Sequence, residues 1–167
     1  AAVSFATHHA VFVRRTLGHE AVDDVGAGVA ASFALGALAA AREGAVRAVR
    51  LVVLGLGNPG ADYSRTRHNA GFWFLDALAE SLGARFGVDG KLLAETAKAE
   101  LAGQSVWLLK PTTFMNRSGQ SVSAALRYYK IEPEECLVAH DELDLPPGAA
   151  RLKFDGGHGG QNGLRDL

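Results

Sequence analysis

Four short segments of this chain contain amides, a histidine and carboxylates; three of them follow apolar runs directly, and the one with the histidine lies a short polar loop after the first. The segments are GLGNPG at residues 55–60, TRHNAGF at 66–72, KPTTFMN at 110–116 and HDELD at 140–144. Imidazole titrates near neutral pH, so His68 is suited to act as a general base. If Asp141 accepts a hydrogen bond from one ring nitrogen of His68, the other nitrogen is free to take a proton from water. The sequence therefore predicts a site built around His68 and Asp141.

Two asparagines stand in the same kind of position. Asn58 lies in an Asn-Pro-Gly turn that would hold its side chain in place. Asn116 carries an amide that can donate to a carbonyl and accept from an amine at once, and Phe114 and Met115 add an apolar wall beside it. Structural interpretations stay open for both, because Asn58 could serve only the turn and Asn116 could cap the next helix.

These segments must be positioned by the elements between them. Apolar runs predict strands at residues 51–56, 94–101, 106–109, 136–139 and 150–154, and helical spacing predicts helices at 70–82, 117–129 and 160–167. We expect a single α/β domain with a mixed, mostly parallel sheet flanked by helices. Open α/β sheets place ligand sites outside the carboxyl ends of their strands, so the four segments should meet at one edge.

The first fifty residues differ from the rest. They are rich in Ala and Gly and contain no Pro, and they predict a strand at 11–13 and a helix at 27–49. We therefore divide the chain into an extension at 1–50 and an α/β domain at 51–167. The uncharged run at 25–41 is better interpreted as a small-residue helix packed against protein than as a membrane span.

Composition sets further bounds. The chain has 167 residues, 48% of them hydrophobic, and a formal net charge of −1, which is typical of one soluble globular domain without bulk affinity for nucleic acid. Any RNA contact would need a local basic face such as Arg151, Lys153 and Arg165. The single cysteine, Cys136, excludes an internal disulfide and fits a reducing compartment. Its apolar surroundings predict a buried, inert thiol.

The same segments also contain patterns typical of dinucleotide binding and of metal binding. GLGNPG satisfies the G-x-G-x-x-G dinucleotide pattern, but the ten residues that follow are polar and lack helical spacing. HDELD could offer metal ligands, although adjacent residues of a strand end point to opposite faces. The loop DGGHGGQNG at 155–163 has five glycines, which indicates a close backbone approach to a ligand, a mobile gate or a plain flexible loop.

Taken together, these segments resemble the bacterial peptidyl-tRNA hydrolase family over residues 51–167. The resemblance implies hydrolysis of the ester between a peptide and the 3′ ribose of tRNA, without a metal or other cofactor, by a cytoplasmic monomer that does not bind membranes. It implies that His68 is the base, Asp141 its orienting partner, and Asn58 and Asn116 further catalytic residues. The substrate-binding residues that we expect are Tyr63, Asn69, Phe114, Met115, Lys153, Gly159 and Asn162.

The chain departs from the family pattern in two ways. Gln161 stands where the family commonly has a second histidine, and an amide cannot titrate, so residue 161 has no proton role. The family also continues past the position of Leu167 with a strand, a lid and a basic region. Residues 11–49 faintly echo that order, so the extension is either a permuted C-terminal part or unrelated sequence. The alternative function is that of a weakened or inactive tRNA-binding remnant.

Overall fold

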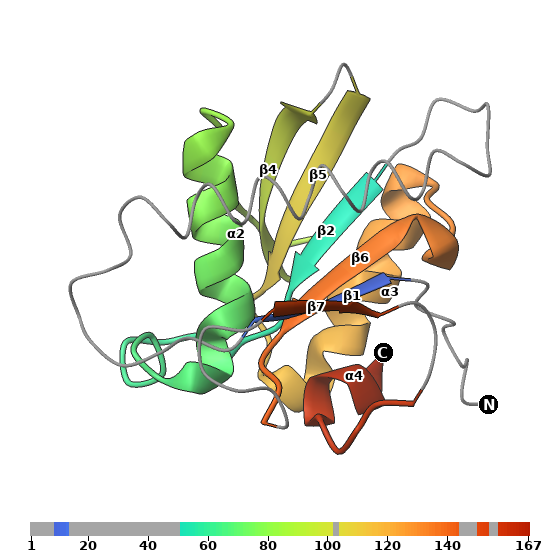
Figure 1. The fold of residues 1–167 in the computed structure, drawn as a ribbon. Coiled ribbons are helices and arrows are strands. Elements are labelled where there is room, and N and C mark those ends of the chain that lie inside the picture. Colours follow the sequence, from blue (N-terminus) through green and yellow to red (C-terminus); the bar gives the residue numbers. More distant parts are fainter. Residues whose placement is uncertain (1–8, 14–50, 102–103, 144–149, 154–156) are drawn as a thin grey trace.

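The computed structural model describes residues 9–13, 51–101, 104–143, 150–153 and 157–167, and these form one mixed sheet with helices on both faces (Figure 1). The seven strands of the described residues are β1 (His9–Val13), β2 (Leu51–Gly55), β3 (Gly87–Asp89), β4 (Ala94–Leu101), β5 (Gln104–Pro111), β6 (Cys136–His140) and β7 (Ala150–Lys153). The longer helices are α2 (Ala70–Ser81) and α3 (Ser118–Tyr129), and α4 (Asn162–Asp166) is shorter. Three 3₁₀ turns complete the set: η1 (Arg67–Asn69), η2 (Met115–Arg117) and η3 (Pro133–Glu135).

The strand order within the sheet is β3-β4-β5-β2-β6-β1-β7. The four neighbours β5, β2, β6 and β1 run parallel, whereas β3, β4 and β7 join by antiparallel pairings. The predicted mixed α/β sheet is thus confirmed, but the expectation that it is mostly parallel was wrong. Among the described strands three pairings are parallel, confined to the centre, and three are antiparallel. Because β5, β2 and β6 point the same way, the loops that follow them leave from a single edge of the sheet.

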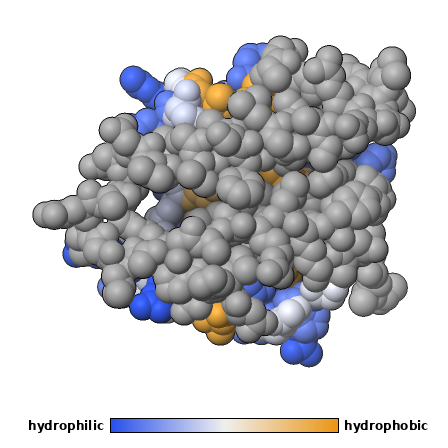
Figure 2. Space-filling view, viewed as in Figure 1, coloured by the Kyte–Doolittle hydropathy of each residue, from blue (hydrophilic) through white to orange (hydrophobic). Residues whose placement is uncertain are grey.

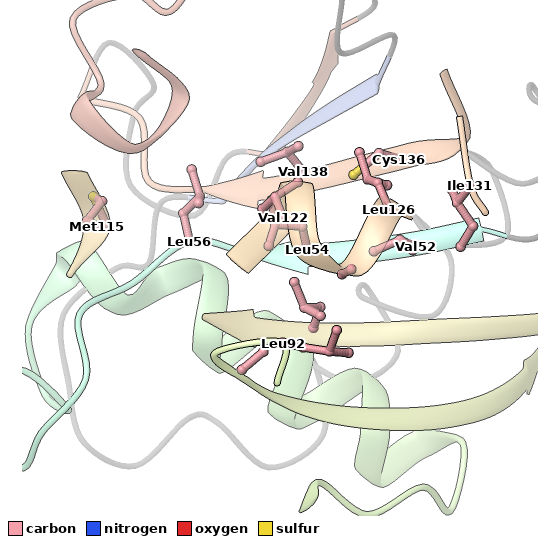
Figure 3. Close-up of a cluster of buried hydrophobic side chains, with 13 residues drawn as sticks. Val52, Leu54, Leu56, Leu92, Met115, Val122, Leu126, Ile131, Cys136 and Val138 are labelled. Carbon is pink, nitrogen blue, oxygen red and sulfur yellow. The ribbon is translucent and has the colours of Figure 1, made fainter. Parts of the chain in front are cut away.

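Side chains of the central strands alternate between two buried clusters, one on each face. In β2, Val53 packs with α2, whereas Val52 and Leu54 pack with α3. This follows from the two-residue period of a strand, and it explains why β2 and β6 are continuous apolar runs rather than alternating ones. Figure 3 shows the cluster on the α3 face, whose labelled members include Leu56, Val122, Leu126, Cys136 and Val138.

The two long helices form as their apolar spacing predicts. In α2 the residues Phe74, Leu75 and Leu78 are buried, and in α3 the buried stripe contains Val122 and Leu126. The fully buried Leu75 and Leu78 each contribute about 1.5–3 kcal/mol by leaving water. The helices therefore hold the sheet from both sides and fix the loops at its edge.

Some predicted boundaries were wrong. Helix α4 begins at Asn162 rather than at residue 160, because Gly159 and Gly160 have left-handed φ angles of +56° and +87° that a right-handed helix cannot include. The predicted strand at 106–109 extends over all of β5, and β3 was not predicted, since its three residues carry no alternating apolar pattern.

Strand β1 comes from the N-terminal extension and lies between β6 and β7. It pairs parallel with β6, with His9 opposite Leu137, and antiparallel with β7, with Ala10 opposite Lys153. If the extension were a permuted C-terminal part of the family fold, one of its strands would have to complete the sheet, as β1 does. Whether residues 1–50 have that origin stays a prediction. The helix predicted at 27–49 lies outside the described residues.

Figure 2 shows hydrophilic residues along the margins of one face, with small hydrophobic patches between them. Large hydrophobic side chains that are exposed within the described ranges are Tyr63, Val88, Leu93, Phe114, Tyr128 and Leu143.

No helix of the described residues is long and apolar enough to cross a membrane. Cys136 is buried as predicted, and burial raises the pKa of its thiol to about 12.

Candidate active site

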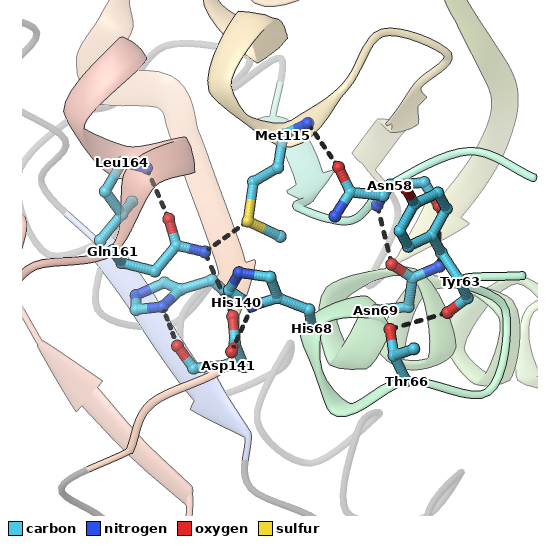
Figure 4. Close-up of polar contacts among 10 residues, drawn as sticks. All are labelled: Asn58, Tyr63, Thr66, His68, Asn69, Met115, His140, Asp141, Gln161 and Leu164. Atoms are coloured by element: carbon cyan, nitrogen blue, oxygen red, sulfur yellow. Dashed lines mark hydrogen bonds and ion pairs between the residues drawn. The ribbon is translucent and has the colours of Figure 1, made fainter.

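His68 and Asp141 meet at the carboxyl edge of the sheet, although 73 residues separate them. The Nδ1 atom of His68 lies 2.6 Å from Oδ2 of Asp141 (Figure 4). The histidine side chain is 47% exposed and the aspartate side chain 14%. With Asp141 ionised, Nδ1 donates to the carboxylate, which leaves Nε2 of His68 as an acceptor. The arrangement can take a proton from a molecule that approaches from solvent.

Two glycines allow this meeting. A Cβ atom on Gly71 would lie 2.4 Å from the carbonyl oxygen of Ala139, and one on Gly55 would lie 2.4 Å from the carbonyl oxygen of Gly71. Any side chain at either position would push the start of α2 away from the ends of β2 and β6. Because η1 directly precedes α2, this close packing carries His68 to the end of β6, where Asp141 follows.

Asn58 and Asn69 form a compact pair beside the histidine. The backbone N–H of Asn58 donates to Oδ1 of Asn69 over 2.7 Å, and Nδ2 of Asn69 donates back to the carbonyl oxygen of Asn58 over 2.9 Å. Oδ1 of Asn58 in turn accepts from the backbone N–H of Met115 over 2.9 Å. The pair therefore ties the loop after β2 to η1 and to the loop after β5. It also fixes the Asn58 amide with its oxygen toward η2.

Gln161 is a site residue that the sequence did not identify as one. Its side chain is buried, with 8% of the residue exposed, and Nε2 donates to Oδ1 of Asp141 over 3.2 Å. The same nitrogen lies 3.1 Å from the sulfur of Met115, and Oε1 accepts from the backbone N–H of Leu164 over 2.8 Å. The signal that could have indicated it is its position in the sequence: it follows Gly159 and Gly160 and directly precedes Asn162, which was already expected in the site.

An aromatic pair forms part of the rim. Tyr63 and Phe114 are 41% and 54% exposed, and their rings meet edge to face with centroids 6.3 Å apart. Met115, by contrast, is buried and belongs to the core on the α3 face. Tyr63 and Phe114 are therefore accessible to a substrate as expected, whereas Met115 is buried and its sulfur contacts Gln161 instead.

The remaining predicted residues lie around this centre. Asn116 is exposed in η2 and does not cap α3, whose N-cap is Arg117, so the capping interpretation was wrong. Asn162 is exposed at the first position of α4, and Gly159 lies in the loop before it. No hydrogen bond joins the Asn116 or Asn162 side chain to another residue that the structure describes. Lys153 ends β7, and its side chain is not among those described.

An open pocket of about 220 Å³ extends from Asn58 and Asn69 along the loop after β5. Trp73 and Phe72 line one part of it, and Lys110 lies at its base between Asp76 and Glu95, at 2.7 Å and 2.9 Å. Burial lowers the pKa of Lys110, but hydrogen bonds and charge attraction from the two carboxylates outweigh burial and raise it above 10.5. The pocket therefore combines aromatic walls with a fixed charge cluster.

The alternative chemistries can be compared with this geometry. GLGNPG leads into turns rather than a helix, and α2 begins only at Ala70, as the argument against a dinucleotide fingerprint expected. In HDELD, the His140 ring is buried, with Nδ1 2.7 Å from the carbonyl oxygen of Asp141, while the Asp141 side chain points to His68. Within the described ranges, no three His, Cys, Asp or Glu side chains gather as metal ligands would.

Fold and site together define a class: an α/β protein with a His–Asp pair at the carboxyl edge of its central parallel strands. Comparison with known proteins gives the family. The model of the peptidyl-tRNA hydrolase family matches residues 52–167, and the chain belongs to this family.

Its relatives are close in sequence and shape. The peptidyl-tRNA hydrolase of Xanthomonas campestris pv. campestris is 74% identical over 119 residues, which cover 71% of this chain and 61% of the relative. That of Stenotrophomonas maltophilia is 74% identical over 118 residues with the same coverage. A crystal structure of the Acinetobacter baumannii peptidyl-tRNA hydrolase matches with a TM-score of 0.70 and 50% identity, over 74% of this chain and 63% of that one. The chain thus spans about 61% of the length of these curated relatives.

Proposed function

We propose that this chain hydrolyses the ester between a peptide and the 3′ ribose of tRNA, with His68 as the general base. The observation that carries the proposal is the His68–Asp141 pair, in which Nδ1 of a 47% exposed histidine side chain is bonded to the carboxylate. Membership of the peptidyl-tRNA hydrolase family supports the substrate class. We further expect a monomer that acts in the cytoplasm, without a metal or other cofactor.

The reaction needs one proton to travel through His68. Nε2 takes a proton from water while the water oxygen bonds to the ester carbonyl carbon, which gives a tetrahedral oxyanion and an imidazolium. Asp141 stabilises the imidazolium through Nδ1. When the carbon–oxygen bond to the ribose breaks, the imidazolium returns the proton to the 3′ oxygen. The products are a peptide with a free carboxyl group and tRNA with a free 3′ hydroxyl.

We assign two amides to the carbonyl group of the ester. Oδ1 of Asn58 is occupied by the Met115 N–H, so the NH₂ group of Asn58 is turned away from that contact and is available as a donor. Asn116, exposed in the next turn, offers a second amide. Donors held in place before the reaction stabilise a developing oxyanion more effectively than water, which must reorient. We assign both amides to positioning the ester and stabilising its oxyanion.

The rest of the edge is suited to the two ends of such a substrate. The Tyr63–Phe114 rim offers exposed aromatic faces, on which unpaired bases or peptide side chains can stack. The pocket beside Asn58 has room for one or two side chains of the peptide. We assign Asn69 to holding Asn58, and Gly159 and Asn162 to the loop that borders the tRNA end. Lys153, with Arg151 and Arg165, would contact phosphate.

The test is release of free tRNA from an N-acetylated aminoacyl-tRNA by this chain, with a chelator present. Aminoacyl-tRNA with a free amine is the control substrate, and the His68→Ala variant is the control protein. We expect turnover of the blocked substrate and little turnover of the control substrate. A folded chain that binds acceptor-stem RNA but releases no tRNA would contradict the proposal and support the binding remnant.

A further inference from the structure

We propose that Gln161 is a positioning residue that holds the Asp141 carboxylate in the orientation in which it serves His68. This role rests on the function proposed above. Asp141 is bonded on both sides: Oδ2 lies 2.6 Å from His68, and Oδ1 accepts from Nε2 of Gln161 over 3.2 Å. A carboxylate held at both oxygens cannot rotate without breaking one of the two bonds.

The orientation of the Gln161 amide follows from its other partner. A backbone N–H can only donate, so the atom that faces Leu164 N must be the oxygen of the amide. The NH₂ group is then directed at Asp141 and at the sulfur of Met115, which can both accept. The opposite orientation would place oxygen against carboxylate and nitrogen against N–H. The amide therefore has one satisfied orientation, and in it Gln161 donates to Asp141.

The surrounding backbone keeps Gln161 in place. Gly163 lies so close that a Cβ atom there would be 2.9 Å from Oε1 of Gln161 and 2.8 Å from Cδ1 of Leu56. Asp166 anchors the other end of α4 by accepting from the backbone N–H of Gly119 over 2.7 Å. Since α3, α4 and the core fix this residue, the donor to Asp141 is rigid although it comes from a glycine-rich segment.

The consequence concerns the tautomer of His68. An oriented, ionised Asp141 favours the form in which Nδ1 carries the hydrogen and Nε2 the lone pair, which is the form that can accept a proton from water. Without the donor at residue 161, the carboxylate can turn toward solvent and the other tautomer becomes more populated. Gln161 never touches the ester in this account and acts only through Asp141.

A purely structural role can be separated from this one, because the amide has two functions. Its oxygen caps α4, and serine is an equally good N-cap but too short to reach Asp141. The Gln161→Ser variant therefore keeps the cap and removes the donor. Gln161→His offers an imidazole N–H as a replacement donor, and the resemblance to the family already implies a histidine at this position. Gln120→Ser, at an exposed site of α3, is the matched control.

The deciding measurement is nitrogen-15 NMR of the His68 ring, assigned with His68→Ala and recorded about two units above the ordinary histidine pKa of 6.5. We expect the Nδ1–H form to dominate in the unsubstituted chain and in Gln120→Ser, and to fall in Gln161→Ser. We also expect kcat for the blocked substrate to fall about 5- to 20-fold in Gln161→Ser, with KM changed less than about twofold. This is less than a full hydrogen bond to a charged group is worth, because Gln161 acts only through Asp141. Gln161→His should recover most of the loss.

An unchanged tautomer population in Gln161→Ser, with the chain still folded by circular dichroism, would overturn the proposal whatever the kinetics show. The tautomer measurement does not depend on turnover. If the unsubstituted chain proved inactive, the proposed function would be contradicted while the role of Gln161 was still decided by the NMR result.

Discussion

Two polar groups lie side by side at the carboxyl edge of the sheet, and they are built in opposite ways. The Asn58–Asn69 pair is closed: the buried Asn69 uses both ends of its amide on the backbone of Asn58. The His68–Asp141 pair is open: Nδ1 of His68 is bonded to Asp141, while Nε2 of this 47% exposed side chain has no hydrogen-bond partner among the described residues. The first pair joins the loop after β2 to η1, and the second joins η1 to the residue that follows β6.

The difference separates support from chemistry. The buried Asn69 amide, with both ends bonded to the backbone of Asn58, stabilises one geometry, while the Asn58 side chain keeps its NH₂ group for a substrate. A half-exposed imidazole can keep one nitrogen without a protein partner at little cost to stability, because water reaches it, and this nitrogen can accept a proton. We therefore expect substitutions in the open pair to reduce turnover without unfolding the chain, and substitution of Asn69 in the closed pair to reduce stability first.

The largest expected effect is that of His68→Ala. Removing the base should lower kcat by at least about 100-fold, in the range of general-base contributions. The free energy of unfolding should change little, because the side chain is half exposed. Single-turnover release of tRNA and urea denaturation measure the two quantities. A folded variant with normal turnover would remove His68 from the mechanism.

Asp141→Asn should have the next largest effect. The amide can turn its NH₂ group toward His68 and favour the wrong tautomer, and the charge that stabilises the imidazolium is gone. We expect kcat to fall about 10- to 100-fold, the equivalent of one hydrogen bond to a charged group. Release of tRNA at saturating substrate measures it. An equal loss from Glu80→Gln, at an exposed position of α2, would indicate a general effect of removing a charge instead.

Asn69→Ala tests the closed pair. The variant leaves the backbone N–H and carbonyl of Asn58 without their partner, which should cost about 1–3 kcal/mol of unfolding free energy. Urea denaturation gives this value, and an exposed substitution such as Gln120→Ala serves as the control. A variant as stable as the unsubstituted chain would mean that Asn69 does not support the loop.

The smallest effect that we predict concerns Lys110 and its two carboxylate partners, Asp76 and Glu95, which line the pocket. Asp76 and Glu95 raise the pKa of Lys110 above its unfolded value of 10.5, so the ion pairs contribute stability that is complete below pH 10.5 and lost as the pH rises through the raised folded pKa. The contribution should be at most about 1 kcal/mol, since both carboxylates are substantially exposed. The stability difference between the unsubstituted chain and Lys110→Met should stay constant from neutral pH to pH 10.5 and then shrink. A stability difference that does not shrink there would be assigned instead to the contact with Phe86, whose ring centroid lies 4.2 Å from Nζ of Lys110.

Much of the fold could be predicted because its signals are local. Strand β4 was predicted at residues 94–101 and helix α2 within one residue of its observed end, since apolar spacing alone sets such elements. The start of α4 could not, because it depends on the left-handed conformations of Gly159 and Gly160. The place of β1 between β6 and β7 could not be predicted either, because strand pairing is a long-range choice.

For the site, the sequence by itself determined which groups are available: an imidazole, a carboxylate and several amides, in the loops that follow apolar strands. It also determined the edge, because parallel strands bring the loops that follow them to the same side. Only the tertiary structure decided the partners. The close contact of Gly71 with the ends of β2 and β6 sets the His68–Asp141 distance, and the packing of α4 against η2 turns the Gln161 amide toward Asp141. Hydrogen bonds depend on distances of a few tenths of an ångström between residues far apart in the chain, and only the packed core fixes such distances.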